Sequence, residues 1–109
     1  MRFLAILIVF FPLAMAFPRL GLHEGYTRLV FDLEKGVQYQ ISQTPDTLTL
    51  RFTGTRPAAS DTDVGSPQVA SYQVVPTPQG ANVFVRLRPS VEVKTFLLED
   101  GSRRRLVVD

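Results

Sequence analysis

The chain has 109 residues, no cysteine and a formal net charge of +2. Disulfides therefore cannot hold the fold together, and the length leaves room for a single domain. So small a net charge argues against a protein that binds nucleic acid mainly through a strongly basic surface.

The N-terminal segment, 1–16, predicts a secretory signal peptide. Arg2 supplies a positive charge, residues 3–11 form an unbroken apolar run, and Ala14 and Ala16 place small residues where a signal peptidase reads them. The run is about half of the ~20 apolar residues that a membrane-spanning helix needs. We expect cleavage between Ala16 and Phe17, export to the periplasm or cell envelope, and no transmembrane segment afterwards. The alternative is an uncleaved apolar N-terminal strand.

Loss of the segment 1–16 removes Arg2 and lowers the net charge from +2 to +1. Most of the remaining basic side chains are arginines, which bind planar carboxylates through a two-pronged fork that lysine lacks. The arginines are Arg19, Arg28, Arg51, Arg56, Arg86, Arg88, Arg103, Arg104 and Arg105.

Beyond a lead segment, 17–25, apolar and polar residues alternate with the period of two that is typical of half-buried strands. The segment 54–67 loses this periodicity and is rich in Gly, Pro, Ser and Asp, which predicts a surface loop. Alternation breaks at Thr95-Phe96, which predicts a β-bulge. The predicted strands are 26–33, 37–42, 47–53, 68–75, 82–88, 91–98 and 103–109, so the mature chain is expected to be all-β.

The two halves of the domain, 26–53 and 68–109, repeat one pattern. A single shift along the chain places Leu29, Phe31, Leu33, Val37 and Tyr39 on Val83, Val85, Leu87, Val91 and Val93, and a slightly longer one places Leu48 and Leu50 on Leu106 and Val108. The alternative is that any two alternating meanders align this well. If the repeat is real, each half forms a small sheet with one apolar face. Packing the two face to face gives a pseudo-symmetric β-sandwich of about seven strands.

The composition offers little for catalysis. His23 is the single histidine, so a zinc site of several nitrogen or sulfur ligands and a Ser-His-Asp arrangement are both disfavoured. Paired carboxylates remain possible by composition. We expect this chain by itself to be neither an enzyme nor a binder of metal, cofactor or nucleic acid. In the triplet 103–105, alternation places Arg104 along the edge of the core and its two neighbours outward.

Two short segments resemble the AMIN domain, Thr27-Arg28-Leu29-Val30-Phe31-Asp32-Leu33 and Arg105-Leu106-Val107-Val108-Asp109. This family is the non-catalytic N-terminal module of periplasmic N-acetylmuramoyl-L-alanine amidases, and it also occurs in type IV pilus secretins. The resemblance covers about residues 24–109. It implies two similar sheets whose outer faces bind peptidoglycan and recruit the parent protein to the envelope or division site. The third strand, residues 47–51, departs from the motif, which argues against equal binding by both faces.

The resemblance makes the outward side chains the candidate ligand-binding residues. Arg103, Arg105 and Arg86, with Phe84, are predicted on one outer face, where they would bind stem-peptide carboxylates. Tyr26, Arg28 and Arg51 are predicted on the other face, and Asp32 matches the first motif. The alternative for each arginine is an ordinary exposed cation paired across strands with Asp32, Glu92 or Asp109.

The sequence stops in mid-strand at Asp109, so we expect a fragment of a longer protein. In the amidases a linker and a zinc-dependent catalytic domain would follow. The alternatives are the wall-binding or protein-interaction domain of a secretin, with envelope proteins as partners, and a stand-alone small exported binding protein.

Overall fold

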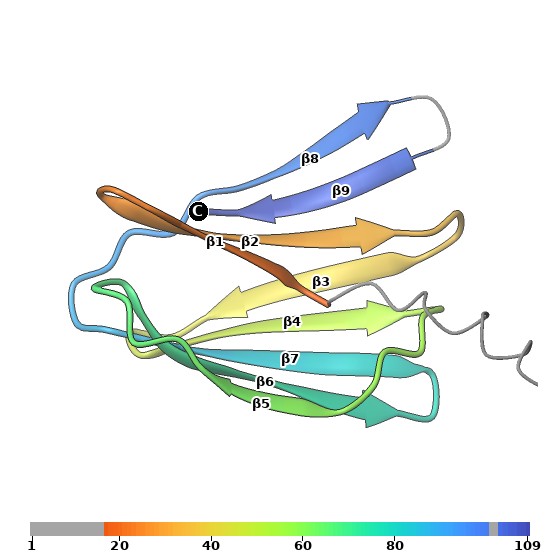
Figure 1. Ribbon diagram of the computed structural model, residues 1–109. Helices are drawn as coiled ribbons and strands as arrows, with labels where there is room; N and C mark the ends of the chain where they lie inside the picture. The colour runs from red at the N-terminus through yellow and green to blue at the C-terminus, as the bar shows by residue number, and fades with distance from the viewer. Residues whose placement is uncertain (1–16, 101–102) are drawn as a thin grey trace, which may run out of the picture.

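The computed structural model describes residues 17–100 and 103–109, and throughout these ranges the protein is all-β, as predicted (Figure 1). The predicted signal peptide lies outside the described residues. Nine strands form two antiparallel sheets, two more strands than expected. The strands are β1 (Arg19–His23), β2 (Tyr26–Leu33), β3 (Gln38–Gln43), β4 (Thr47–Thr53), β5 (Ser60–Asp63), β6 (Val69–Thr77), β7 (Gly80–Leu87), β8 (Thr95–Asp100) and β9 (Arg103–Val108).

The two additional strands lie where none was predicted. β1 occupies the lead segment 17–25 and pairs with β2, while β5 lies inside the predicted loop 54–67 and pairs with β6. Both are short edge strands. β5 is entirely polar, and β1 alternates over only five residues, with Leu20 and Leu22 as its apolar positions, which is too short a run to stand out as a strand. The domain therefore begins before residue 26.

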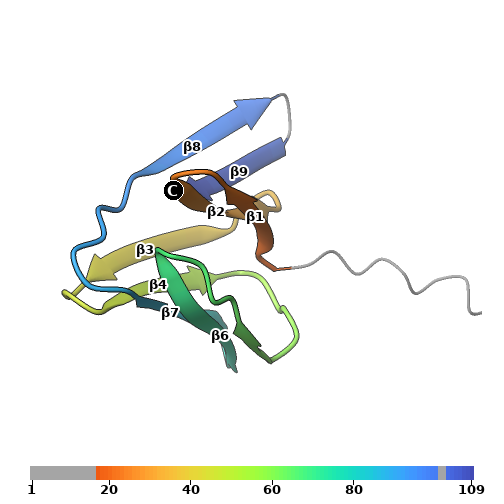
Figure 2. The same cartoon turned by 60° about the vertical axis from the view of Figure 1, so that its left-hand side comes forward.

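Sheet A has the strand order β1-β2-β9-β8, and sheet B has the order β3-β4-β7-β6-β5. Figure 2 shows the two sheets as separate layers. The alternating apolar residues of both sheets form one buried cluster between them. Phe31 from sheet A and Phe52 from sheet B meet there with ring centroids 5.0 Å apart. The cluster also includes Leu29, Leu33, Val37, Leu48, Leu50, Val69, Tyr72, Val74, Ala81, Val83, Val85, Leu87, Leu106 and Val108.

The expectation that each half of the chain forms its own sheet is wrong, because each sheet combines strands from both halves. β2 pairs with β9 of the second half, and β4 pairs with β7. After β2 the chain turns at residues 34–36 and crosses to the other sheet. Val37, which is 2% exposed, inserts into the core at this crossing. Burial of Val37 makes the connection a corner of the sandwich instead of a flat hairpin.

The backbone register nevertheless repeats as the sequence predicts. The shift that places Leu29 on Val83 carries the bounds of β2 onto those of β7. Leu29 pairs with Val108 in sheet A, and its counterpart Val83 pairs with Leu50 in sheet B. Leu50 and Val108 are thus equivalent positions, as the longer shift requires. Sheet A, read β1-β2-β9-β8, corresponds strand by strand to β6-β7-β4-β3, with β5 added at one edge.

The predicted bulge at Thr95-Phe96 is also wrong. β8 and β9 stay in continuous register from Thr95 to Asp100, and the irregularity of the fold lies instead in β6, between Val69 and Ser71. Alternation breaks at Phe96 because an apolar side chain points outward there and is 40% exposed. The apolar residue belongs to the outer surface, so it needs no bulge to explain it.

Candidate functional site

The candidate residues whose side chains the structure describes point outward, as predicted, but the two faces contain different sets from those expected. Tyr26, Arg28, Asp32 and Arg105 lie on sheet A, whereas Arg51, Phe84 and Arg86 lie on sheet B. The predicted grouping of Arg103 and Arg105 with Phe84 and Arg86 is therefore wrong, as is that of Tyr26 and Arg28 with Arg51. The cause is the exchange of strands between the halves. The backbone of Arg103 belongs to β9, and its side chain lies outside the described part.

On sheet A, Arg28 forms a bidentate ion pair with the carboxylate of Asp109. Its Nε and one terminal nitrogen donate to the two carboxylate oxygens of Asp109, at 2.7 and 2.8 Å. The hydrogen bond from Arg28 holds the pKa of the Asp109 carboxyl below its ordinary value, and the same bond raises the pKa of Arg28. Two of the Arg28 N–H donors that were expected to bind a ligand carboxylate are thus already hydrogen-bonded to Asp109.

Aromatic rings flank this ion pair. The Arg28 guanidinium carbon lies 5.5 Å from the Tyr26 ring centroid and 6.0 Å from that of Phe96, within cation–π range. His23 stacks on Tyr26 with centroids 4.6 Å apart. The sequence pointed to Tyr26 but missed Phe96, because the apparent break in alternation concealed its outward position.

A second fork on sheet A joins Arg19 to Asp32, with nitrogen–oxygen distances of 2.8 and 2.9 Å. Arg105 lies directly across from Asp32 in the β2–β9 register, yet within residues 17–100 and 103–109 no ion pair is found for it. Asp32 thus belongs to an internal pair rather than to a ligand site. Arg19 was not among the candidates, although its alternation with Gly21 and His23 could have placed it on this face.

Arg104 follows the edge of the core, as predicted. One of its terminal nitrogens donates to the carbonyl oxygen of Val37 at 2.6 Å and to that of Glu34 at 3.4 Å. These carbonyls belong to the corner where the chain leaves β2 and crosses to β3. Arg104 therefore ties β9 to that corner, which is a structural role.

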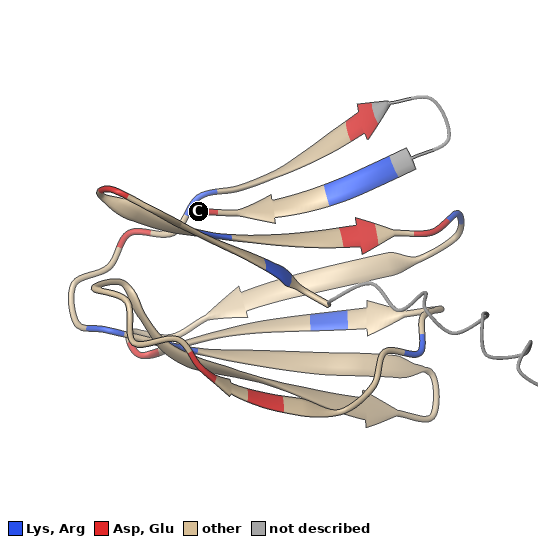
Figure 3. Cartoon of the chain, viewed as in Figure 1, with Lys and Arg blue, Asp and Glu red and all other residues tan. Residues whose placement is uncertain are grey.

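The outer face of sheet B is different in character. β3, β4 and β7, all described in full, contain no aspartate or glutamate (Figure 3). Arg51 lies between Gln40 and Asn82 in the register of these strands. Among the described residues, neither Arg51 nor Arg86 has an ion-pair partner. The other outward residues of β3 and β4 are polar, namely Gln38, Ser42, Thr47, Thr49 and Thr53. The carboxylates on the outer face of sheet B lie on the edge strand β5, at Asp61 and Asp63.

A shallow depression of about 350 Å³ surrounds Arg51. Four of its nine lining residues carry side-chain amides. A guanidinium surrounded by amide and hydroxyl groups can bind an anion and also hydrogen-bond the neutral polar groups beside it. The lining includes Gln38, Gln40, Thr53, Thr77, Gln79 and Asn82. Sequence alternation put Arg51 and Phe84 outward but gave no sign of the depression.

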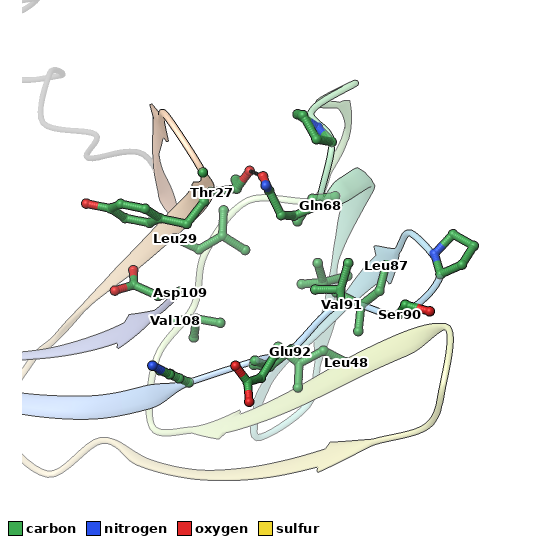
Figure 4. A pocket seen from close by; sticks show the side chains of 18 residues that line it. Thr27, Leu29, Leu48, Gln68, Leu87, Ser90, Val91, Glu92, Val108 and Asp109 are labelled. Atoms are coloured by element: carbon green, nitrogen blue, oxygen red, sulfur yellow. Dashed lines mark hydrogen bonds between the residues drawn. The ribbon is translucent and has the colours of Figure 1, made fainter.

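A larger opening, about 570 Å³, lies between the two sheets at one end of the sandwich. Figure 4 shows apolar side chains around it, among them Leu29, Leu48 and Val108, with Glu92 and Asp109 at its rim. Thr27 of β2 contacts the segment before β6 at the edge of this opening. Its hydroxyl lies within hydrogen-bond distance, 2.7 Å, of both Ser66 Oγ and Gln68 Oε1. No part of the sequence pattern indicated this opening.

Within the described ranges no three His, Asp or Glu side chains lie close enough together to hold a metal ion. That part of the chain also contains no helix long and apolar enough to cross a membrane. Comparison with known protein families, with curated proteins and with solved structures finds no match to this chain.

Proposed function

We propose that this chain is an exported, non-catalytic module that binds peptidoglycan, and that it forms the N-terminal wall-targeting part of an N-acetylmuramoyl-L-alanine amidase. The observation that carries the proposal is the outer face of β3, β4 and β7, which joins two arginines to amide and hydroxyl side chains without a carboxylate. The two AMIN-like motifs and the repeated register support the assignment to an envelope protein.

Peptidoglycan offers groups that fit this face. Its stem peptides carry carboxylates, which suit a guanidinium fork, and its peptide and N-acetyl amides match the side chains of Gln40 and Asn82. Phe84, which is 37% exposed, supplies an aromatic surface for the apolar side of a sugar ring. The face is open, with a shallow depression around Arg51, which suits a long polymer better than a small enclosed substrate.

Sheet B is the more suitable of the two faces because of charge. On sheet A, Arg28 and Arg19 already bind Asp109 and Asp32, so a ligand carboxylate must compete with an internal one. On sheet B, Arg51 and Arg86 need no such exchange. The departure of residues 47–51 from the family motif argued against equal binding by the two faces, and the difference in charge agrees with that expectation. The face favoured by charge is the one that contains residues 47–51.

Retention of the protein by purified sacculi tests the proposal. Replacing both Arg51→Gln and Arg86→Gln removes two charge-assisted contacts, and we expect retention to weaken about tenfold or more. Arg56→Gln removes the same charge from an exposed position outside these strands, and it is the matched control. Unchanged retention of the double variant overturns the proposal. Loss of retention with Arg105→Gln, and not with the double variant, would move the binding face to sheet A.

A further inference from the structure

β8 forms one edge of sheet A, and half of its backbone groups have no partner among the described residues. Lys94 and Asp109 exchange both backbone hydrogen bonds, at 2.8 Å each. Such mutual pairs alternate along an antiparallel ladder, so even-numbered residues of β8 bond to β9. The N–H and C=O groups of Thr95, Leu97 and Glu99 therefore point away from the sheet. Figures 1 and 2 show β8 at the edge of sheet A.

The exposed side chains of β8 are unlike those of its counterpart in sheet B. Phe96 and Leu98 are 40% and 42% exposed on the outer face. By the shift that places Val37 on Val91, the corresponding positions at the β3 edge are Ser42 and Thr44, both polar and exposed. The fold thus does not require apolar residues at this edge. Sheet proteins usually protect an edge with charge, and an apolar edge favours pairing with another strand.

We propose that β8 pairs antiparallel with β8 of a second copy of this chain, in a register centred on Leu97. Leu97 and its copy then exchange two hydrogen bonds, and each Thr95 does the same with Glu99 of the other copy. Phe96 comes to lie opposite Leu98 of the second copy at a close, non-hydrogen-bonded position. Sheet A continues across the two copies, and the proposal does not depend on peptidoglycan binding.

The self-complementarity of β8 is what identifies the occupant as a second copy. Hydrogen-bond parity requires odd-numbered residues of one copy to lie opposite odd-numbered residues of the other, so the centre can fall on any residue of β8. A centre at Phe96 sets Leu98 against Lys94, and a centre at Leu98 sets Phe96 against Asp100. A centre at Thr95 sets Phe96 against Lys94, and a centre at Glu99 sets Leu98 against Asp100. Among these centres, Leu97 alone gives both Phe96 and Leu98 an apolar partner, and it also brings Lys94 opposite the acidic position 100. A strand pair of this size buries little surface, so we expect a weak dimer.

Cysteine trapping tests the register, because the chain has no cysteine of its own. Phe96→Cys and Leu98→Cys are prepared as single variants, mixed in equal amounts and oxidised. In the proposed register positions 96 and 98 of two copies face each other, within reach of a disulfide. Two copies of position 96 lie diagonally, about 7–8 Å apart, which is too far. We expect disulfide-linked dimer in the mixture and little with either variant alone.

The matched control at the β3 edge is the mixture of Ser42→Cys and Thr44→Cys, which should give no more dimer than random collision. Far-UV circular dichroism confirms that each variant is folded. Several outcomes overturn the proposal: equal cross-linking in the β3 control, cross-linking of the Phe96→Cys variant alone as strong as in the mixture, or no cross-linking in the mixture. The last result is also the one expected if the edge instead accepts a strand from a different protein.

Discussion

Phe17, the residue that follows the predicted cleavage site, joins the two sheets. Its ring meets Phe31 of sheet A at 5.1 Å and Phe52 of sheet B at 5.0 Å, both edge to face. We therefore expect Phe17→Ala to destabilise the whole domain, although the sequence places this residue in a lead segment outside it.

The expected loss follows from these contacts. Each edge-to-face pair contributes about 0.5–1.5 kcal/mol beyond burial, and the partly buried ring contributes about 1–2 kcal/mol more. A total of about 3 kcal/mol lies at the lower end of the range for Phe→Ala substitutions in cores, as suits a ring that is not fully buried. With a urea dependence of about 1.5 kcal/mol per molar, the unfolding midpoint falls by about 2 M.

Urea unfolding followed by far-UV circular dichroism measures this loss. Phe84→Ala serves as the control, because Phe84 is 37% exposed on the outer face and should cost less than about 1 kcal/mol. Equal midpoints for Phe17→Ala and the parent protein would refute the reasoning, since the N-terminal residue would then lie outside the cooperative unit.

Two further predictions concern a close backbone contact and a titrating ion pair. Gly80→Ala should lower the free energy of unfolding by about 3 kcal/mol in a urea titration, because the added Cβ would overlap the Phe52 carbonyl oxygen in the adjacent strand. The control is Asn82→Ala, at an outward-facing position of the same strand. A smaller loss for Gly80→Ala than for Asn82→Ala would contradict the prediction. Asp109→Asn should reduce stability at pH 7, and the difference from the parent should shrink below about pH 4. The sign follows because Arg28 lowers the folded-state pKa of Asp109, so its stabilisation is present above the unfolded-state pKa and disappears as pH falls through the folded one. Thermal unfolding across pH 2–8 measures this, and a difference independent of pH would exclude the ion pair as its source.

The strength of the sequence prediction varies with the signal in each element. In β2, β4 and β7 an apolar residue recurs at every second position along most of the strand, and the structure places these strands within a few residues of the predicted bounds. β1 and β5 were missed because they are short, and an edge strand has too little burial to impose a pattern. The outward orientation of Arg28, Arg51 and Arg86 followed from the same alternation.

The partners of those arginines could not be predicted from local sequence. Arg28 pairs with Asp109, 81 positions away, because β2 and β9 are neighbours in sheet A. The lack of acidic residues around Arg51 likewise depends on β3, β4 and β7 lying side by side. Alternation fixes which side of a strand a residue occupies, but not which strand lies next to it.

The sequence by itself determined the all-β class, the outward and inward faces of the main strands and the two shifts that relate one half of the domain to the other. Only the tertiary structure decided that the halves exchange strands. That decision depends on the corner at Val37, where burying one valine directs the chain into the opposite sheet. A period-two pattern is the same for a hairpin within one sheet and for a crossing between two, because both keep the apolar side chains facing the core.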